Sequence, residues 1–480
     1  MQSLTEKLAE VMEADAGAID PLASLFSLGL DSLMAVEFAA VVQSELGLRL
    51  ELEAFQNDPR LQDLAHLGLE QLLPEAGVSA PVLDLTAEAQ LPGDWLLPET
   101  PALESPGERV LMTGASGFLG AYLLAGQLRR WPDLQVRCLV RCPAAEQGLE
   151  RLEANLRGYG LWDPAWRARL EVVPSDLAQP RFGLEEDAFK SLIAGVGGIL
   201  HNGAQLGYLA SYSQLAAANV GSTRDLLRLA MEHGPIRLEL ISSVAAFEAD
   251  ACRNREILED EPLLHWQGIH LGYSQTKWVS DRLVWKAGQS GLPVTIYRPP
   301  LIGGNTRPDR DGRHHWQEGN LLQRLLQGCL QLGKVPDLEW ELDAVPVDYV
   351  ADAISALAWS DGAAGQVYHL QHPQPLLLSE LLARLSARGM RLETVSTEEW
   401  LTAIAGTSSD HPLLPLLPFF KQRWGLEGLT FPDRNVRGVR ARPSCKFTML
   451  ALEALGVQCP DYDLLEQAWG MGLLGQATVE

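Results

Sequence analysis

Apolar residues recur along this chain in two patterns, and the change from one to the other falls near residue 109. Over residues 4–12, 32–46 and 61–73 they return every three or four positions, which predicts three amphipathic helices. Beyond residue 108, short apolar runs alternate with helical patterns. We interpret six of these runs as strands: RVLMTG (109–114), QVRCLVR (135–141), LEVVPSD (170–176), GGILHNGA (197–204), RLELISS (237–243) and PVTIYRP (293–299). This alternation predicts an α/β fold with a parallel sheet wrapped by helices.

The two patterns divide the chain into four parts. Residues 1–76 are expected to form a small helical unit, and residues 77–107 a linker or a lid-like wrap, because prolines replace the periodic apolar positions there. Residues 108–300 form the predicted sheet domain, to which a helix and a strand within 343–375 are expected to return. The rest of 301–480 is expected to form a mostly helical subdomain that covers a pocket and binds substrate.

The composition is that of an ordinary soluble globular protein, with 46% apolar and 21% charged residues. No run of about 18 apolar residues is present, so no membrane span is expected. The N-terminal segment lacks the apolar core of a signal peptide. Six scattered cysteines without Cys-x-x-Cys spacing predict reduced thiols in a cytoplasmic protein. The adjacent His314 and His315 lie in a polar loop without ligand spacing, so we predict no metal site.

Negative charge is concentrated at the beginning of the chain. Residues 1–105 hold 19 acidic and 3 basic residues, a net charge of −16 out of −24 for the whole chain. Such a segment would repel phosphates, so nucleic acid is not expected as a partner. It favours docking onto basic protein surfaces, although an acidic face that only aids solubility accounts for the charge equally well.

A glycine triplet follows the first predicted strand, in VLMTGASGFLG (110–120). Gly114, Gly117 and Gly120 permit a tight turn, a close approach of backbone to a pyrophosphate, and close packing of strand and helix. The helix that follows presents free N–H groups to an anion. This placement predicts a Rossmann-type, doubly wound sheet that binds a dinucleotide. The predicted contacts in this turn are Gly114, Ser116, Gly117, Phe118, Leu119 and Gly120.

The second predicted strand ends in a basic residue. NAD-specific sites usually carry an acidic residue there, for the ribose 2′-hydroxyl. This chain has Arg141, with Arg151 ten residues on, and a guanidinium suits a 2′-phosphate. We therefore predict NADPH rather than NADH. A solvated strand end is the alternative for Arg141, and a surface role accounts equally well for Arg151.

Four further residues are candidate cofactor contacts. Asp176 and Leu177 follow the third predicted strand, and a turn role for Asp176 is equally open. Asn202 lies in HNGA, at the end of the fourth strand, where backbone passes near the cofactor. Asn219 is expected either to order the next helix or to hold a catalytic water.

The segment GYSQTKW (272–278) holds a candidate catalytic pair. Tyr273 and Lys277 are four residues apart and so share a helix face. A neighbouring ammonium stabilises tyrosinate and lowers the tyrosine pKa toward that of a working general acid. Both residues are also expected to contact the cofactor, since Lys277 is placed to hold the nicotinamide ribose. Ser243, at the end of the fifth strand, supplies a hydroxyl to steady the substrate oxygen.

On these residues the chain resembles the extended short-chain dehydrogenase/reductases over about residues 108–375, including YRPPLIGG (297–304). Its motifs are similar to those of thioester reductase domains, which end polyketide synthases, nonribosomal peptide synthetases and carboxylic acid reductases. The matching segments are TGASGFLGAYLL (113–124), LVR (139–141), NVGST (219–223) and GYSQTKWVSDRLV (272–284). By this resemblance Ser243, Tyr273 and Lys277 carry the catalytic roles. Pro300 departs from the family's usual glycine, and Ser243 from its frequent threonine.

The first 73 residues resemble acyl or peptidyl carrier domains, and LGLDSLMAVEF (28–38) is similar to the carrier motif of polyketide synthases. The resemblance implies 4′-phosphopantetheine on Ser32, at a helix N-terminus where the helix dipole favours a phosphodiester. Without this context, Asp31 and Ser32 would be interpreted as helix-capping residues.

Together these resemblances imply a terminal thioester reductase module. It would release a pantetheine-tethered acyl chain with NADPH as an aldehyde, with a second reduction to the alcohol left open. Its expected partners are the substrate on its own carrier domain, a phosphopantetheinyl transferase and upstream synthase modules. The alternatives are a redox-inactive, Dieckmann-type cyclase tethered to a carrier and a nucleotide-sugar epimerase or dehydratase.

Overall fold

The computed structural model describes residues 83–92 and 107–474, apart from 208, 209, 233–235, 318, 361, 387–391, 409 and 426. Within residues 2–70 it omits 13, 27, 29, 31–33, 36, 37, 40, 43–49, 51–54 and 56–58. The chain divides into two compact units. The first comprises residues 1–84, 206–216 and 271–273, and the second comprises the remainder.

A seven-stranded parallel sheet is the centre of the second unit, and its strand order is β12-β7-β5-β4-β1-β2-β3. Strands leave β1 in both directions, so the topological switch point lies between β1 and β4. The strands are β1 (Arg109–Thr113), β2 (Gln135–Val140), β3 (Leu170–Pro174), β4 (Gly198–His201), β5 (Arg237–Ile241), β7 (Val294–Arg298) and β12 (Val367–His369). The predicted α/β fold with a doubly wound sheet is confirmed.

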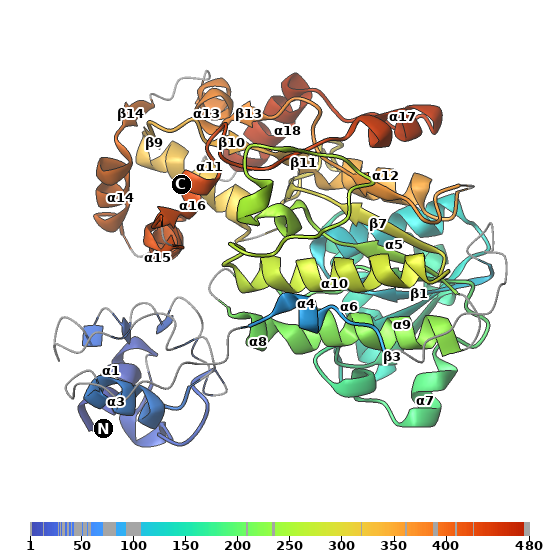
Figure 1. Ribbon diagram of the computed structural model, residues 1–480, viewed down its shortest axis with the longest axis horizontal. Coiled ribbons are helices and arrows are strands. Elements are labelled where there is room, and N and C mark those ends of the chain that lie inside the picture. The colour runs from blue at the N-terminus through green and yellow to red at the C-terminus, as the bar shows by residue number, and fades with distance from the viewer. Residues whose placement is uncertain are drawn as a thin grey trace. The chain divides into compact units, whose positions relative to one another are not determined.

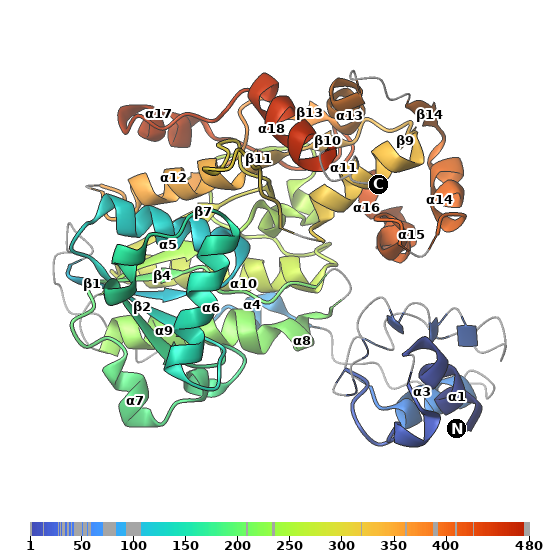
Figure 2. The same cartoon turned by 180° about the vertical axis from the view of Figure 1, so that it is seen from behind.

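Helices cover both faces of the sheet. Figure 1 shows α9 and α10 on one face, and Figure 2, seen from behind, shows α5 and α6 on the other. The fully buried Val110 and Met112 of β1 belong to the same core as Leu123 of α5 and Ile354 of α12. These helices are α5 (Phe118–Arg130), α6 (Ala145–Gly158), α7 (Glu186–Ser191), α9 (Ser222–Glu232), α10 (Gly272–Gln289) and α12 (Val347–Leu357).

The C-terminal part of the chain is mostly helical, with short strands paired between distant segments. β11 (Ala344–Pro346) pairs with β8 (Leu301–Gly303), and β17 (Arg442–Pro443) pairs with β6 (Glu256–Ile257), in both cases parallel. The remaining elements are α11 (Leu321–Leu332), β9 (Lys334–Pro336), β10 (Glu341–Leu342), β13 (Leu376–Leu377), α13 (Leu378–Ser386), β14 (Glu393–Val395), α14 (Thr397–Ala405), α15 (Leu417–Lys421), β15 (Arg423–Trp424), β16 (Leu429–Thr430), α16 (Phe431–Arg434), α17 (Lys446–Ala454) and α18 (Tyr462–Leu474).

The first unit contains α1 (Gln2–Val11), α3 (Leu61–Glu70) and α8 (Tyr212–Ala216). Its N-terminal part has an apolar core that includes the fully buried Leu8, Leu25, Phe38 and Leu64. Most of the predicted helix 32–46, including Ser32, lies outside the described residues, and so does Asp31.

One short helix, α4 (Leu85–Glu88), lies within the region predicted as linker and belongs to the second unit. All six cysteines are free. No helix in the described part of the chain has both the length and the apolar character needed to cross a membrane.

Candidate active site

The glycine turn after β1 is packed so closely that two of its positions exclude a side chain. Gly114 has a φ of +71°, and a Cβ there would lie 2.7 Å from the Gly203 nitrogen in the loop after β4. A Cβ on Gly120 would overlap the Gly114 carbonyl oxygen. The turn therefore brings the start of α5 close to the ends of β1 and β4.

The beginning of α5 is suited to an anion. Its N-cap residue, Gly117, is exposed and provides no side-chain hydrogen bond to the first N–H groups of the helix. Ser116 and Leu119 are half-buried, whereas Phe118 and Gly120 are buried. Unsatisfied N–H groups at a helix N-terminus bind phosphates well, so this turn fits the pyrophosphate of a dinucleotide.

The two predicted arginines lie next to each other. The Arg151 guanidinium on α6 donates a 3.0 Å hydrogen bond to the Arg141 backbone oxygen after β2. Both side chains are exposed. The fold thus gathers two cations at the end of β2, where a 2′-phosphate would be bound.

The loop after β4 is tied to the glycine turn. Asn202 donates from Nδ2 to the Gly114 carbonyl oxygen at 3.2 Å, and the Thr113 hydroxyl accepts from the Gly203 N–H at 2.8 Å. Thr113 also hydrogen-bonds the buried His201 ring at 2.8 Å. Burial lowers the pKa of His201 to about 3, so this imidazole is neutral.

The two residues after β3 have different surroundings. Asp176 accepts from the Ala178 N–H at 3.0 Å, which is the geometry of an Asx turn. The Leu177 side chain packs against Gly203, because a Cβ on that glycine would overlap Leu177 Cδ1. The turn interpretation of Asp176 thus has direct support, and its contact with the adenine ring stays a prediction.

Asn219 lies in a one-turn π-helix, Ala217–Gly221, and is only 3% exposed. Its Oδ1 accepts from the Gln205 N–H at 2.7 Å, and its Nδ2 donates to the Gln205 oxygen at 3.0 Å and the Thr276 hydroxyl at 2.9 Å. The side chain therefore fastens the loop after β4 to α10. Its two predicted roles, ordering the next helix or holding a catalytic water, stay predictions.

The three predicted catalytic residues lie at the end of β5 and on the first two turns of α10. The Ser243 hydroxyl accepts from the Ala245 N–H at 3.2 Å and so caps the short helix Val244–Phe247. Lys277 is buried and donates from Nζ to the Ile241 oxygen at 2.9 Å. Tyr273 is half-buried, four residues before Lys277 on α10.

Burial lowers the pKa of Lys277 to about 8, and the negative charge of Asp281 partly opposes this shift. Asp281 lies one turn after Lys277, so both face the end of β5. A lysine whose pKa lies near the working pH is a common feature of catalytic sites.

Sequence reasoning missed a buried ion pair behind this site. Arg298 of β7 donates to both carboxylate oxygens of Asp281, at 2.9 and 2.8 Å, and both side chains are fully buried. Asp281 also accepts from the Ser242 hydroxyl at 2.6 Å, and Arg298 donates to the His369 ring at 3.2 Å. The pair therefore fastens the residue before Ser243 to α10. Its members occur in the motifs WVSDRLV and YRPPLIGG, but they meet only when α10 packs against β7.

Glu248 is a second residue that sequence reasoning missed, and no spacing signal marks it. It ends the short helix that Ser243 begins. Burial raises the pKa of Glu248 to about 7, while the Ser274 hydroxyl and the Arg434 charge act in the opposite direction. This carboxyl therefore titrates near neutrality. It lies close to Ser274, the residue that follows Tyr273.

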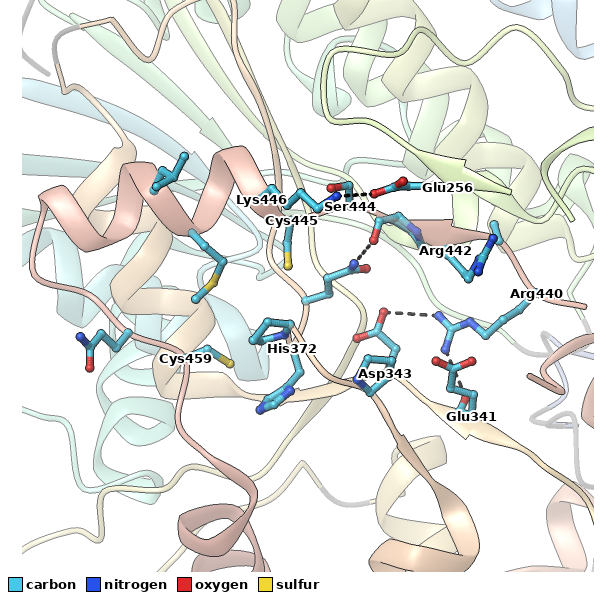
Figure 3. A pocket seen from close by; sticks show the side chains of 18 of the residues that line it. Glu256, Glu341, Asp343, His372, Arg440, Arg442, Ser444, Cys445, Lys446 and Cys459 are labelled. Atoms are coloured by element: carbon cyan, nitrogen blue, oxygen red, sulfur yellow. Dashed lines mark hydrogen bonds and ion pairs between the residues drawn. The ribbon is translucent and has the colours of Figure 1, made fainter. Parts of the chain in front are cut away.

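The structure contains a cavity of about 1030 Å³ elsewhere in the second unit, shown in Figure 3. Its lining includes Arg440, which forms a 3.3 Å ion pair with the buried Asp343, together with Ser444 and Cys459. Burial raises the pKa of Asp343 to about 6. None of the predicted cofactor or catalytic residues lines this cavity.

His314 and His315 are engaged within their own loop. His315 Nε2 lies 2.9 Å from Asp309 Oδ2, and His314 Nδ1 lies 3.1 Å from the Asn305 backbone oxygen. Among the residues that the structure describes, no three His, Cys, Asp or Glu side chains form a group able to hold a metal ion.

Comparisons with known proteins agree with this geometry. Residues 112–354 match the family model described as Male sterility protein, an NAD-binding family, and residues 2–67 match the phosphopantetheine attachment site family. The chain is 34% identical to the terminal R domain from the myxalamid PKS-NRPS biosynthetic pathway. That match covers 82% of this chain and 97% of the other, with a TM-score of 0.72. This chain belongs to the terminal reductase family.

An archaeal thiolation-reductase di-domain has the same fold, with a TM-score of 0.69 over 99% of this reductase chain and 97% of the other. Its 17% identity supports the likeness of fold alone. Curated relatives include a linear gramicidin synthase of Brevibacillus parabrevis, 32% identical over 92% of this chain, and an L-2-aminoadipate reductase of Penicillium chrysogenum, 33% identical over 67%. The chain spans only 8% and 24% of these two proteins.

The chain is an NADPH-dependent oxidoreductase joined to a phosphopantetheine carrier domain. These findings do not favour the cyclase or the epimerase alternative. The carrier motif precedes the reductase motifs along the chain, as the match at residues 2–67 precedes the match at residues 112–354.

Proposed function

We propose that this reductase releases an acyl or peptidyl chain from its own carrier domain as an aldehyde, and that Ser243, Tyr273 and Lys277 act on the thioester carbonyl. The observation that carries the proposal is the hydrogen bond from the buried Lys277 to the Ile241 oxygen. It fixes an ammonium one helical turn from Tyr273, beside the strand end that bears Ser243. The carrier match in the same chain supports a tethered substrate.

The residues around the glycine turn fit NADPH. The uncapped N–H groups of α5 would hold the pyrophosphate, and the adjacent Arg141 and Arg151 the 2′-phosphate. When bound, NADPH supplies the hydride for the reduction. Asn202 and Asn219 would keep the loop after β4 in place at the switch point of the sheet.

The proton chemistry is assigned to the chain's own side chains. Tyr273 would hold the phenolic proton that neutralises the developing alkoxide, and the Lys277 ammonium would lower the pKa of that phenol. Ser243 would donate a second hydrogen bond to the same oxygen. A preorganised donor of this kind contributes about 3 kcal/mol to transition-state stabilisation. The resulting hemithioacetal would then break its C–S bond, which gives the aldehyde, and its hydroxyl proton would leave with the sulfur as the free pantetheine thiol.

The carrier side of the proposal rests on Ser32, which falls within the matched residues 2–67. Its hydroxyl would bear the phosphopantetheine arm after modification by a transferase, and upstream synthase modules would load the acyl chain. A cytoplasmic location, in keeping with the six free cysteines, belongs to the same proposal.

The test is to follow NADPH oxidation with a soluble acyl thioester and to identify the product by mass spectrometry. Aldehyde formed in step with NADPH oxidation supports the proposal, and alcohol with twice the NADPH consumption would show a second reduction. A cyclised product without NADPH oxidation would contradict the proposal in favour of the cyclase alternative.

A further inference from the structure

The segment 85–90 lies on the surface of the second unit, in a region whose sequence predicts a linker or a lid-like wrap. Figure 1 shows α4 beside α9 and α10. Leu85 is fully buried and Ala89 is 1% exposed. The Trp266 indole donates a 3.0 Å hydrogen bond to the Thr86 hydroxyl. A four-residue helix is not stable alone, so these contacts with the reductase fold are what maintain it.

Two cations from two helices hold the C-terminal end of α4. Arg224 of α9 donates from Nη2 to the Glu88 backbone oxygen at 2.5 Å and to its carboxylate at 3.1 Å. Lys286 of α10 donates from Nζ to the Ala89 oxygen at 2.6 Å and to the Gln90 side-chain oxygen at 3.0 Å. The last carbonyl groups of a helix lack partners within it, and cations there satisfy both their hydrogen bonds and the helix dipole.

We propose that residues 85–90 form an anchor that fixes the carrier tether to the reductase surface between α9 and α10. With the anchor bound, residues 71–84 are the tether between helix α3 and the anchored segment along the chain. Without it, the tether that leads from α3 to the sheet domain would be residues 71–106. Fully extended, these two lengths reach at most about 50 Å and about 130 Å.

The anchor therefore raises the effective concentration of the carrier domain at the reductase site. For a simple chain, effective concentration falls roughly as the −3/2 power of tether length, so release of the anchor should lower it about fourfold. This inference rests on the proposed function, since it concerns delivery of the tethered thioester. The inference assigns no catalytic role to Arg224 or Lys286.

The experiment uses the full chain with its carrier loaded, and it compares the wild type with two variants. One is Arg224→Ala combined with Lys286→Ala, and the other replaces residues 85–90 with a Gly-Ser segment of equal length. The readout is the competing concentration, defined as the concentration of soluble acyl thioester that halves the yield of aldehyde from the carrier-bound thioester. A second readout, independent of turnover, is hydrogen exchange of the backbone amides of residues 85–90.

We expect faster exchange in the double variant, and in both variants we expect about a fourfold lower competing concentration with unchanged turnover of the soluble thioester. The matched control is Arg228→Ala on the same helix, because Arg228 forms its ion pairs with Glu186 and Glu232 instead of with the anchor. An unchanged competing concentration in the Gly-Ser variant would overturn the inference. Failure of the wild type to reduce soluble thioester would instead refute the proposed function.

Discussion

Lys277 Nζ donates a 2.9 Å hydrogen bond to the Ile241 backbone oxygen, and this contact connects α10 to the end of β5. It fixes the ammonium group in a buried position, where desolvation lowers the pKa of Lys277 to about 8. Asp281 acts in the opposite direction, since its negative charge favours the protonated amine. The protonation state of Lys277 therefore depends on the balance between its burial and the charge of the Asp281 carboxylate.

The first prediction concerns the pH dependence of turnover. Above a pH of about 8 Lys277 loses its proton, so the positive charge that the proposed mechanism places beside Tyr273 disappears and kcat should fall. Asp281→Asn removes the charge that raises this pKa, so the basic limb of the profile should move to lower pH. The measurement is kcat against pH for both proteins with a soluble thioester. A basic limb at the same pH in both would contradict the assignment.

The second prediction concerns stability. The pKa of Lys277 is lowered in the folded state, from 10.5 to about 8, so the unfolded state binds more protons between these pH values. The contribution of Lys277 to the free energy of unfolding should therefore increase as the pH rises from about 8 to 10.5. The full cost below pH 8 is on the order of 3 kcal/mol.

Lys277→Met removes this cost without leaving a cavity. Denaturant unfolding from pH 7 to 10 should show the variant gaining most over the wild type at the low end of the range. The difference between the two proteins should shrink as pH rises. A difference that stays constant across the range would show that Lys277 is not titrating differently in the two states.

The third prediction tests the glycine turn. Gly120→Ala places a methyl group against the Gly114 oxygen, so the turn must open and NADPH binding should weaken at least tenfold. The control is Gly158→Ala at the end of α6, where an added Cβ meets nothing within 4 Å. Fluorescence titration with NADPH measures both. Equal affinity in the two variants would refute the proposed pyrophosphate site.

The fourth prediction concerns the choice between NADPH and NADH. Arg141→Ala removes a charge-assisted contact with a 2′-phosphate, worth about 1.5–3 kcal/mol, so the KM for NADPH should rise about 10- to 100-fold while that for NADH changes little. Arg157→Ala on α6 is the control, because Arg157 already pairs with Glu153 at 2.6 Å. A loss that is equal for both cofactors would point to a structural role for Arg141.

Local signals in the sequence were sufficient to predict the sheet. The run RLELISS contains β5, Arg237–Ile241, and PVTIYRP contains β7, Val294–Arg298, because buried parallel strands are short, apolar and bounded by turn residues. The spacing of Gly114 and Gly120 likewise predicted a turn whose close packing the structure contains.

Contacts between distant segments were beyond such reasoning. The Asp281–Arg298 pair joins a helix to a strand, and neither residue has a local pattern that indicates burial. Glu248 is similar, since only the folded surroundings raise its pKa. For the proline-rich region around Leu85 the sequence left a linker and a lid-like wrap open, because it has no periodic signal. The contacts with Arg224 and Lys286 could not be predicted from it.

The most direct test of the account is a single turnover of the loaded carrier with NADPH that carries deuterium at the transferred position. Mass spectrometry of the released product is the readout. We predict an aldehyde with one deuterium on its carbonyl carbon, and at least a hundredfold slower release when Tyr273→Phe removes the phenolic proton. Release of an aldehyde without deuterium, or at an unchanged rate in the Tyr273→Phe variant, would contradict the account.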